Sequence, residues 1–356
     1  MGSLRRAGVA AAVAAAPVAL AYRFALIYRG RAGYPERRPP RFVPTDFGMA
    51  YEDMAIESGG QTLPGWWIPA QESAPGPAIL LVHGWESARD RTLPMARFLN
   101  AAGFHVLTFD IRAHGANPPD PLPISAGEFG ADSTAAFSAL MTRPEVTVGA
   151  IAGHSMGGIG AILAAAADPR VAALVSTASP ADPYRLTRQT FRLARLPIPD
   201  PIAYPLAFVT THVYLRPRGH TVRDISAARA LARYAGPVLL AHGELDQVVP
   251  LAHMSRLERV ARQNPGRRVE SVVVPGGHHS WLFEDPTYRR RVASFLVASL
   301  GGPFSPQEAG DRAAATECLR LPDPDAQFAA VAAEPGGFHS LARLVGIVPA
   351  PPEIES

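Results

Sequence analysis

Ser155 lies in the stretch AGHSMGG, which fits the pattern Gly-x-Ser-x-Gly between an apolar run and an alanine-rich run. A serine in a sharp strand-to-helix turn exposes its hydroxyl, and glycine at Gly153 and Gly157 leaves room for the backbone to pass. The following helix directs its positive end toward an oxygen on which negative charge develops. These residue types indicate nucleophilic attack by Ser155, and an ordinary βα turn is the alternative interpretation.

A serine hydroxyl needs a base to take its proton and a carboxylate to orient that base. Asp246 follows Ser155 by 91 positions in HGELDQVVP, and His279 follows Asp246 by 33 positions in VVPGGHHSW. Each of these residues comes directly after an apolar run that predicts a strand. The order Ser, Asp, His along the chain is the order found in one class of hydrolases.

The elements that must position these side chains alternate between short apolar runs and longer alanine-rich and leucine-rich runs. Strands are expected at 78–84, 104–110, 147–153, 171–177, 237–243 and 268–276, and helices at 93–102, 127–141, 156–167, 251–263 and 286–300. This alternation predicts an α/β fold, a mostly parallel twisted sheet with helices on both faces. Residues 49–70 predict an antiparallel hairpin at its edge, and chemistry is expected at the carboxyl ends of the parallel strands.

Five motifs occur in a fixed order between Met49 and Leu300, namely LLVHGW, FDIRAHG, GHSMGG, HGELDQVVP and PGGHHSW. In this order the chain resembles the α/β-hydrolase superfamily, in particular its esterase and its serine-aminopeptidase or prolyl-oligopeptidase-like branches. The resemblance implies Ser155 as the nucleophile, Asp246 as the acid and His279 as the base. It also implies catalysis through an acyl-enzyme, without a cofactor.

Two of these assignments have alternatives. Relatives place the base after a Pro-Gly pair and two further residues, which selects His279 over the neighbouring His278. Glu244 and Asp182 are alternative acids, since some hydrolases take the acid from an earlier strand. The oxyanion hole is expected from two backbone amides, those of Met156 and Trp85. Met156 directly follows Ser155, and Trp85 directly follows Gly84.

Three polar residues near the first motifs are expected to be structural. His83 is interpreted as holding its loop through hydrogen bonds. Asp110 and Arg112 resemble a loop brace of related hydrolases, and an ion pair between them is expected. Binding of a metal or of the substrate by Asp110, Arg112 and His114 is the alternative.

About 55 residues, from about 180 to 234, separate two predicted strands where a short crossover would suffice, so this insertion is predicted to be a helical lid. Its apolar residues are expected to line an acyl pocket together with Trp85, notably Leu196, Tyr204 and Phe208, or else to pack the insertion on the core. Four arginines at helical spacing are interpreted as a solvated face, with an anionic partner as the alternative, and are Arg185, Arg188, Arg192 and Arg195.

The two ends of the chain are expected to lie outside the hydrolase domain, which is placed at 42–300. Residues 1–41 combine a hydrophobic helix with a basic linker, and residues 7–22 carry no charge. A membrane anchor with a cytoplasmic catalytic domain is favoured here, because the heavier basic flank follows the apolar run. A secreted protein with a signal peptide and a soluble protein with a surface helix are the alternatives. Residues 301–356 are interpreted as a C-terminal appendage.

Composition excludes several classes of protein. All 34 basic residues are arginine and the net charge is +3, but the arginines are dispersed, so no nucleic-acid partner is expected. The single Cys318 forms no internal disulfide, and no Cys/His spacing indicates a metal site. A serine hydrolase acting on small carboxylic esters is therefore the favoured function. A peptidase or amidase, an acyltransferase and a catalytically inactive hydrolase-fold binding protein are the alternatives.

Overall fold

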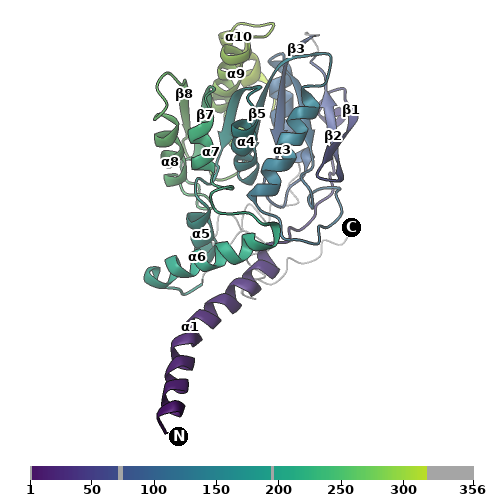
Figure 1. Cartoon of the computed structure of the whole chain (residues 1–356). Helices are drawn as coiled ribbons and strands as arrows, with labels where there is room; N and C mark the ends of the chain where they lie inside the picture. Colours follow the sequence, from purple (N-terminus) through teal and green to yellow (C-terminus); the bar gives the residue numbers. More distant parts are fainter. Residues whose placement is uncertain (1, 71–74, 194–195, 319–356) are drawn as a thin grey trace.

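The computed structural model describes residues 2–70, 75–193 and 196–318, and within them one sheet of eight strands forms the centre of the molecule (Figure 1). The strands lie in the order β1-β2-β4-β3-β5-β6-β7-β8. Their bounds are β1 Glu52–Ser58, β2 Gln61–Ile68, β3 Gly76–Val82, β4 His105–Phe109, β5 Val146–His154, β6 Val171–Thr177, β7 Val238–Gly243 and β8 Val269–Val274. The pairs β1–β2 and β2–β4 are antiparallel and all others are parallel. The predicted α/β sheet and its edge hairpin are thus confirmed.

Helices cover both faces of this sheet. The helices of the described residues, including those that lie beyond the sheet, are α1 Gly2–Ala32, α2 Leu93–Ala101, α3 Ala126–Leu140, α4 Met156–Ala167, α5 Pro183–Leu193, α6 Asp200–Leu215, α7 Ala227–Arg233, α8 Ala252–Ala261, α9 Pro286–Leu300 and α10 Pro306–Ala315. One core cluster joins the sheet to α3, α4, α7 and α8, and a second joins it to α2 and α9. The bounds of β6, α4 and α9 are those predicted from the sequence.

The position of a strand in the sheet explains its composition. Every residue of β3 is buried, because β3 lies in the middle of the sheet with helices on both of its faces. The edge strand β1 instead exposes most of its residues and buries only Ile56 and Ser58. A central parallel strand therefore reads as a continuous apolar run, as in AILLV.

The insertion after β6 divides into two parts. Helices α5 and α6 lie beyond the carboxyl edge of the sheet, whereas α7 packs on α4 and α8 and belongs to the helical layer (Figure 1). The insertion proper is therefore shorter than the predicted range of about 180–234. Its movement as a lid stays a prediction.

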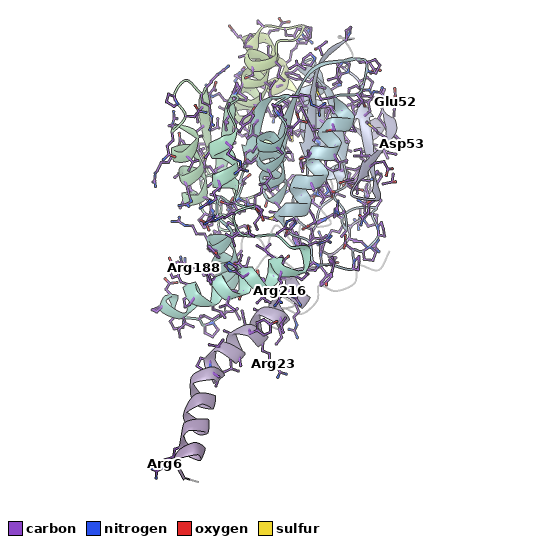
Figure 2. All side chains as sticks on the ribbon, in the orientation of Figure 1. Arg6, Arg23, Glu52, Asp53, Arg188 and Arg216 are labelled. Atoms are coloured by element: carbon purple, nitrogen blue, oxygen red, sulfur yellow. The ribbon has the colours of Figure 1, made fainter. Side chains whose placement is uncertain are left out.

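The N-terminal helix α1 packs on α6 through its last turns and projects away from the domain toward its N-terminus (Figure 1). The ring of Phe24 lies 5.6 Å from that of Phe191, and the ring of Tyr28 lies 5.8 Å from Phe191 and 6.1 Å from Tyr214, measured between centroids. Arg6 and Arg23 mark the projecting part in Figure 2. No helix in the described part of the chain has both the length and the apolar character to cross a membrane.

The C-terminal appendage begins with a helix that packs on the domain. Helix α10 lies against α9, and the guanidinium of Arg289 donates to the carbonyls of Ala313 at 3.0 Å and Ala314 at 2.7 Å. The rest of the predicted appendage, residues 319–356, lies outside the described residues.

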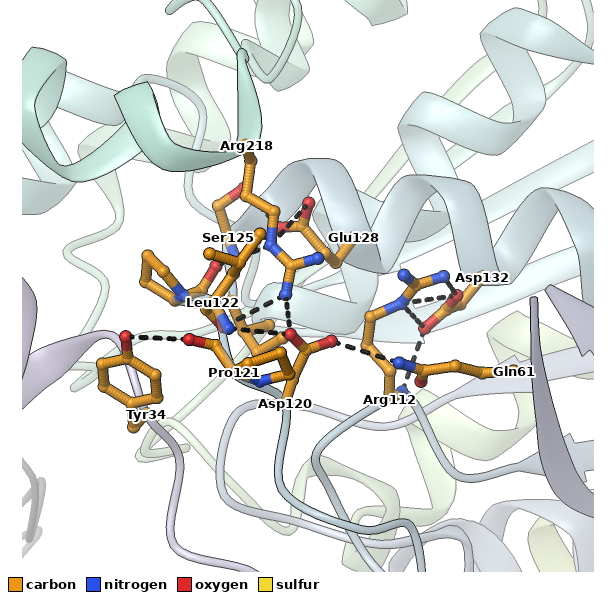
Figure 3. A network of polar contacts seen from close by, with 12 residues as sticks. Tyr34, Gln61, Arg112, Asp120, Pro121, Leu122, Ser125, Glu128, Asp132 and Arg218 are labelled. Carbon is orange, nitrogen blue, oxygen red and sulfur yellow. Dashed lines mark hydrogen bonds and ion pairs between the residues drawn. The ribbon is translucent and has the colours of Figure 1, made fainter. Parts of the chain in front are cut away.

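A buried polar network ties the segment after α6 to the body of the domain (Figure 3). Arg218 pairs with Asp120 at 2.6 Å and donates to the carbonyls of Leu122 and Pro123. His220 bonds Glu128 of α3 at 2.7 Å, and Glu128 also accepts from the hydroxyl of Ser125 at 2.8 Å. These contacts fix the end of α6 where it joins the core.

We predict that His220→Gln lowers stability more in mild acid than in base. The hydrogen bond to Glu128 raises the pKa of His220 despite its partial burial. A raised pKa in the folded state adds stability below about pH 6.5, the ordinary value, and that stability is lost as pH rises through the folded pKa. The Tm difference from wild type should be greater at about pH 6 than at about pH 9 by about 2 °C.

The matched control for this experiment is His212→Gln, which changes an exposed histidine of α6 that is hydrogen-bonded to the Phe208 carbonyl. This variant leaves the bond between His220 and Glu128 in place, so the loss of stability that comes from that bond should be absent from it. Equal Tm differences for His220→Gln at both pH values would contradict the prediction.

Candidate active site

Ser155 stands in a strained turn between β5 and α4. Its backbone has φ 55° and ψ −121°, a conformation that a residue with a side chain adopts only when its surroundings impose it. Its amide donates to the carbonyl of Thr177 at 2.9 Å. A Cβ on Gly153 would lie 2.2 Å from the Gly157 carbonyl oxygen, and one on Gly157 would lie 2.2 Å from that of His83. The requirement for glycine at both positions is confirmed.

A continuous line of hydrogen bonds joins the three side chains singled out in the sequence. The Ser155 Oγ lies 3.0 Å from Nε2 of His279, and Nδ1 of His279 lies 2.8 Å from Oδ2 of Asp246. His278 is exposed to solvent instead. The structure therefore places His279, and not His278, between Ser155 and Asp246.

The carboxylate of Asp246 is surrounded by hydrogen-bond donors. Its Oδ1 accepts from the amides of Val248 at 2.9 Å and Val249 at 2.8 Å, while Nε2 of His242 lies 3.3 Å from Oδ2. Burial by itself would raise the pKa of Asp246, but the nearby His279 and these hydrogen bonds hold the pKa well below its ordinary value. Asp246 is therefore a stable anion at the base of the site.

The two alternative acids are engaged elsewhere. The Glu244 carboxylate accepts from the amide of Gly276 at 2.9 Å. The Asp182 carboxylate accepts from the amide of Tyr184 at the start of α5 and pairs with Arg256 at 3.3 Å. Neither takes the position at His279 Nδ1 that Asp246 occupies.

His154 is a residue of the site that sequence reasoning missed. Its Nε2–H donates to the backbone carbonyl of His279 at 2.7 Å, and the two rings lie 4.9 Å apart. Burial and the neighbouring His279 lower the pKa of His154 to about 4, so it is neutral at pH 7. Its place between Gly153 and Ser155 was the available signal, because the turn brings it to the strand edge.

No group of His, Cys, Asp and Glu side chains in the described ranges is arranged to hold a metal ion.

Trp85 and Met156 flank Ser155. Met156 is the first residue of α4, where amides have no partner within the helix. Trp85 follows Gly84, and a Cβ on Gly84 would lie 3.4 Å from the Cβ of Ser155. Both side chains line the same pocket as Ser155. The turn that carries Trp85 therefore passes directly beside the serine.

His83 holds this turn, as predicted. Its Nδ1–H donates to the Gly84 carbonyl at 2.7 Å and its Nε2 accepts from the Ile111 amide at 3.0 Å. Burial lowers the pKa of His83 and keeps the ring neutral. A neutral imidazole with one donor and one acceptor satisfies both bonds.

The predicted ion pair between Asp110 and Arg112 is wrong. Asp110 pairs with Arg89 and accepts from the Arg89 amide at 2.7 Å, whereas Arg112 pairs with the fully buried Asp132 of α3 (Figure 3). The guanidinium of Arg112 also donates to the Ser58 hydroxyl at 3.1 Å. Both residues brace loops, but each uses a partner distant in the sequence, because a buried carboxylate on α3 requires its own cation.

A pocket of about 990 Å³, its open mouth included, lies next to Ser155 and is lined mostly by apolar atoms. Trp85 lines it as predicted. Leu196, Tyr204 and Phe208 do not. Tyr204 and Phe208 are 55% and 53% exposed on the solvent face of α6, and Leu196 packs on the cluster formed by α1, α5 and α6.

The predicted arginine stripe holds α5 to α6. Arg188 lies 4.2 Å from the centre of the Tyr204 ring and 3.3 Å from Asp200, and Arg192 lies 3.2 Å from the same carboxylate. Arg195 lies outside the described residues. The stripe is thus partly neutralised rather than wholly solvated.

The chain is similar to known proteins in both sequence and fold. A model of the alpha/beta hydrolase family matches residues 79–294. An uncharacterized protein of Mycobacterium tuberculosis is 28% identical over 234 residues, which cover 65% of this chain and 73% of that protein. An esterase of Pyrococcus furiosus aligns with TM-score 0.60 and 23% identity, covering 75% of this chain and 98% of that one.

A second solved structure carries a different activity on the same fold. An acylaminoacyl peptidase of Pyrococcus horikoshii aligns with TM-score 0.56 and 17% identity, covering 73% of this chain and 44% of that one. At these identities the two structures indicate the fold alone.

We predict that Gly157→Ala destabilises the protein, because the added methyl would overlap the carbonyl of His83. The expected loss in the free energy of unfolding is about 1–3 kcal/mol, measured by urea titration. Gly30→Ala is the control, since nothing lies within 4 Å of its added methyl and it stands inside α1. This control should gain about 0.5–1 kcal/mol. Unchanged stability of Gly157→Ala would mean that the turn is looser than described.

Proposed function

This chain belongs to the alpha/beta hydrolase family, and from that premise we propose that it is a serine hydrolase that cleaves carboxylic esters through an acyl-enzyme. The observation that carries the proposal is the line from Ser155 Oγ through His279 to Asp246, with distances of 3.0 and 2.8 Å. Such a line allows a proton to leave the serine as its oxygen attacks.

In the first half of the reaction, Ser155 Oγ attacks the ester carbonyl carbon while Nε2 of His279 takes the serine proton. The imidazolium that forms keeps its Nδ1–H bonded to Asp246, whose low pKa keeps it ionised. The amides of Met156 and Trp85 are proposed to donate to the tetrahedral oxygen. The imidazolium then protonates the departing alcohol, which leaves the acyl group on Ser155.

In the second half, the neutral His279 removes a proton from water, and the hydroxide attacks the acyl-enzyme. A second tetrahedral intermediate collapses, the serine oxygen regains its proton from His279, and the carboxylic acid is released. His154 acts as a positioning residue in both halves, because it anchors the backbone of His279.

The pocket supports a substrate with an apolar acyl part. Its mostly apolar wall beside Ser155 suits a hydrocarbon acyl group. A peptidase or an acyltransferase would use the same acyl-enzyme and differ in the group that attacks or leaves. A catalytically inactive binding protein on this fold would have no need of a base held 3.0 Å from the serine.

We predict that Ser155→Ala and His279→Ala each lower kcat/KM for nitrophenyl acetate by about 10⁴-fold or more, because each removes one member of a unit. His278→Ala, which changes an exposed neighbour of the same type, should leave the rate within about twofold. Labelling of wild type by a fluorophosphonate, absent in Ser155→Ala, gives the second readout. A wild type that neither hydrolyses the ester nor takes the label would overturn the proposal.

We expect Asp246→Asn to lower kcat by about 10⁴-fold with little change in KM. The amide cannot stabilise the imidazolium, and it would present an N–H to the wrong histidine tautomer. Glu244→Gln is the control, because it neutralises a carboxylate two positions away that bonds Gly276 rather than His279. Equal losses in both variants would show that net charge, and not the bond to His279, matters.

A further inference from the structure

The wall of the pocket beside Ser155 is made of other residues than those predicted from the sequence. Helices α1, α5 and α6 build it, and α1 contributes Tyr28 and Ala32. From the other two helices come Leu186, Thr187, Thr190, Thr211, Tyr214 and Leu215. A helix from outside the hydrolase domain thus reaches the site where an acyl group would lie.

The hydroxyl groups in this wall donate their hydrogen bonds to one another or to backbone carbonyls. Thr190 donates to the Thr187 carbonyl at 2.6 Å, so the Tyr28 hydroxyl must be the donor in its 2.8 Å bond to Thr190. In the same way Thr211 donates to the Ala207 carbonyl at 2.7 Å, so Thr187 is the donor in its 2.9 Å bond to Thr211. Each hydroxyl has only one proton to give.

The two remaining hydroxyls of the pocket, apart from Ser155, follow the same rule. Tyr214 donates to the Ile124 carbonyl at 2.5 Å, and Ser125 donates to the Glu128 carboxylate at 2.8 Å. Of the hydroxyl-bearing side chains that line the pocket, Ser155 alone does not have its proton committed to the wall. A ligand therefore meets mainly methyl groups, methylenes and ring faces rather than hydroxyl donors, and the Asp182 carboxylate in the lining is already bonded to the Tyr184 amide and paired with Arg256.

Tyr28 is held firmly in this wall. It is 7% exposed, its hydroxyl is bonded to Thr190, and its ring packs against Phe191 and Tyr214. These contacts come from both neighbouring helices, so the phenol cannot turn aside to make room for a ligand.

We infer that α1, α5 and α6 form a binding site for an unsubstituted hydrocarbon acyl chain, and that Tyr28 limits the chain length accepted. The inference rests on the proposed function, in which this chain is the acyl part of an ester. A chain that carries a hydroxyl group is disfavoured, because the hydroxyls of the wall have no proton free to donate to it and the Asp182 carboxylate is already paired with Arg256. Specificity then depends on a helix that holds no residue of the proposed catalytic machinery.

The test compares kcat/KM for nitrophenyl esters from acetyl to dodecanoyl. Tyr28→Ala should raise kcat/KM for the longer esters by about fourfold for each further methylene accommodated, and leave the acetyl ester unchanged. Phe24→Ala is the matched control, because Phe24 packs on the same Phe191 ring without lining the pocket. Its profile should equal that of wild type.

Two further variants keep the test decisive if Tyr28→Ala does not fold. Ala32→Leu enlarges a small lining residue and should lower kcat/KM for long esters relative to acetyl. Tyr28→Phe removes the hydroxyl and keeps the ring, so its chain-length profile should be unchanged. Suppose that wild type, Ala32→Leu and Tyr28→Ala all hydrolyse the acetyl ester and show the same dependence of kcat/KM on acyl chain length. This result would overturn the inference and leave the proposed function standing.

A binding measurement tests the proposed acyl-chain site separately from the proposed hydrolase activity. The Ser155→Ala protein is titrated with decanoate and with 6-hydroxydecanoate. The Kd for decanoate should be lower than the Kd for 6-hydroxydecanoate by about tenfold or more. The titration needs no turnover, so it decides the site even if the protein hydrolyses no ester. Equal affinities for the two acids, or none for either, would overturn the inference.

Discussion

The contact between the Gly157 backbone and the carbonyl of His83 fixes the geometry on which the site depends. The absence of a side chain at Gly157 lets the first turn of α4 approach the end of β3. That approach forces Ser155 to positive φ and brings the turn at Trp85 beside it. His83 then fastens the same turn to Ile111 beyond β4, so three adjacent strands share one rigid edge. Strain at a single serine is supported by the packing of the whole sheet edge.

A buried anion organises the other half of the site. Asp246 has no exposed side-chain surface, and it is stabilised by two amides of its own loop and by His242 and His279. Each of these donors also has a structural task, because the amides shape the loop after β7 and His242 bonds the Val249 carbonyl at 2.7 Å. His154 closes the arrangement by linking β5 to the loop after β8. Burial of the charge thus joins segments that are far apart in the sequence.

Local patterns explain what could be predicted from the sequence. Continuous apolar runs, alanine-rich stretches and a Gly-x-Ser-x-Gly turn depend on neighbours in the chain, and they located β6, α4, α9 and Ser155. The place of His279 was predicted through resemblance and agrees with the hydrogen bonds found.

Partnerships between distant segments could not be predicted in the same way. Arg112 stands two residues from Asp110 but pairs with Asp132 of α3, while Asp110 pairs with Arg89, so closeness in the sequence did not indicate either partner. Tyr204 and Phe208 are apolar enough to line a pocket, but both are exposed to solvent. The rotation of α6 about its axis decides which face of this helix points toward the pocket. Tyr28 lies 127 positions before Ser155, and no periodicity in the sequence connects the two.

The docking of α1 on α6 divides the molecule into parts that are held by different contacts. Residues of the sheet and of the Ser155 turn are fixed by close packing, so most changes there cost folding free energy. Helix α1 supplies no strand and no turn of that core, yet it forms part of the wall facing the serine. Replacement of this helix would therefore alter the pocket wall without touching the sheet or the Ser155 turn, and the boundary after α1 is a natural junction for building chimeric proteins.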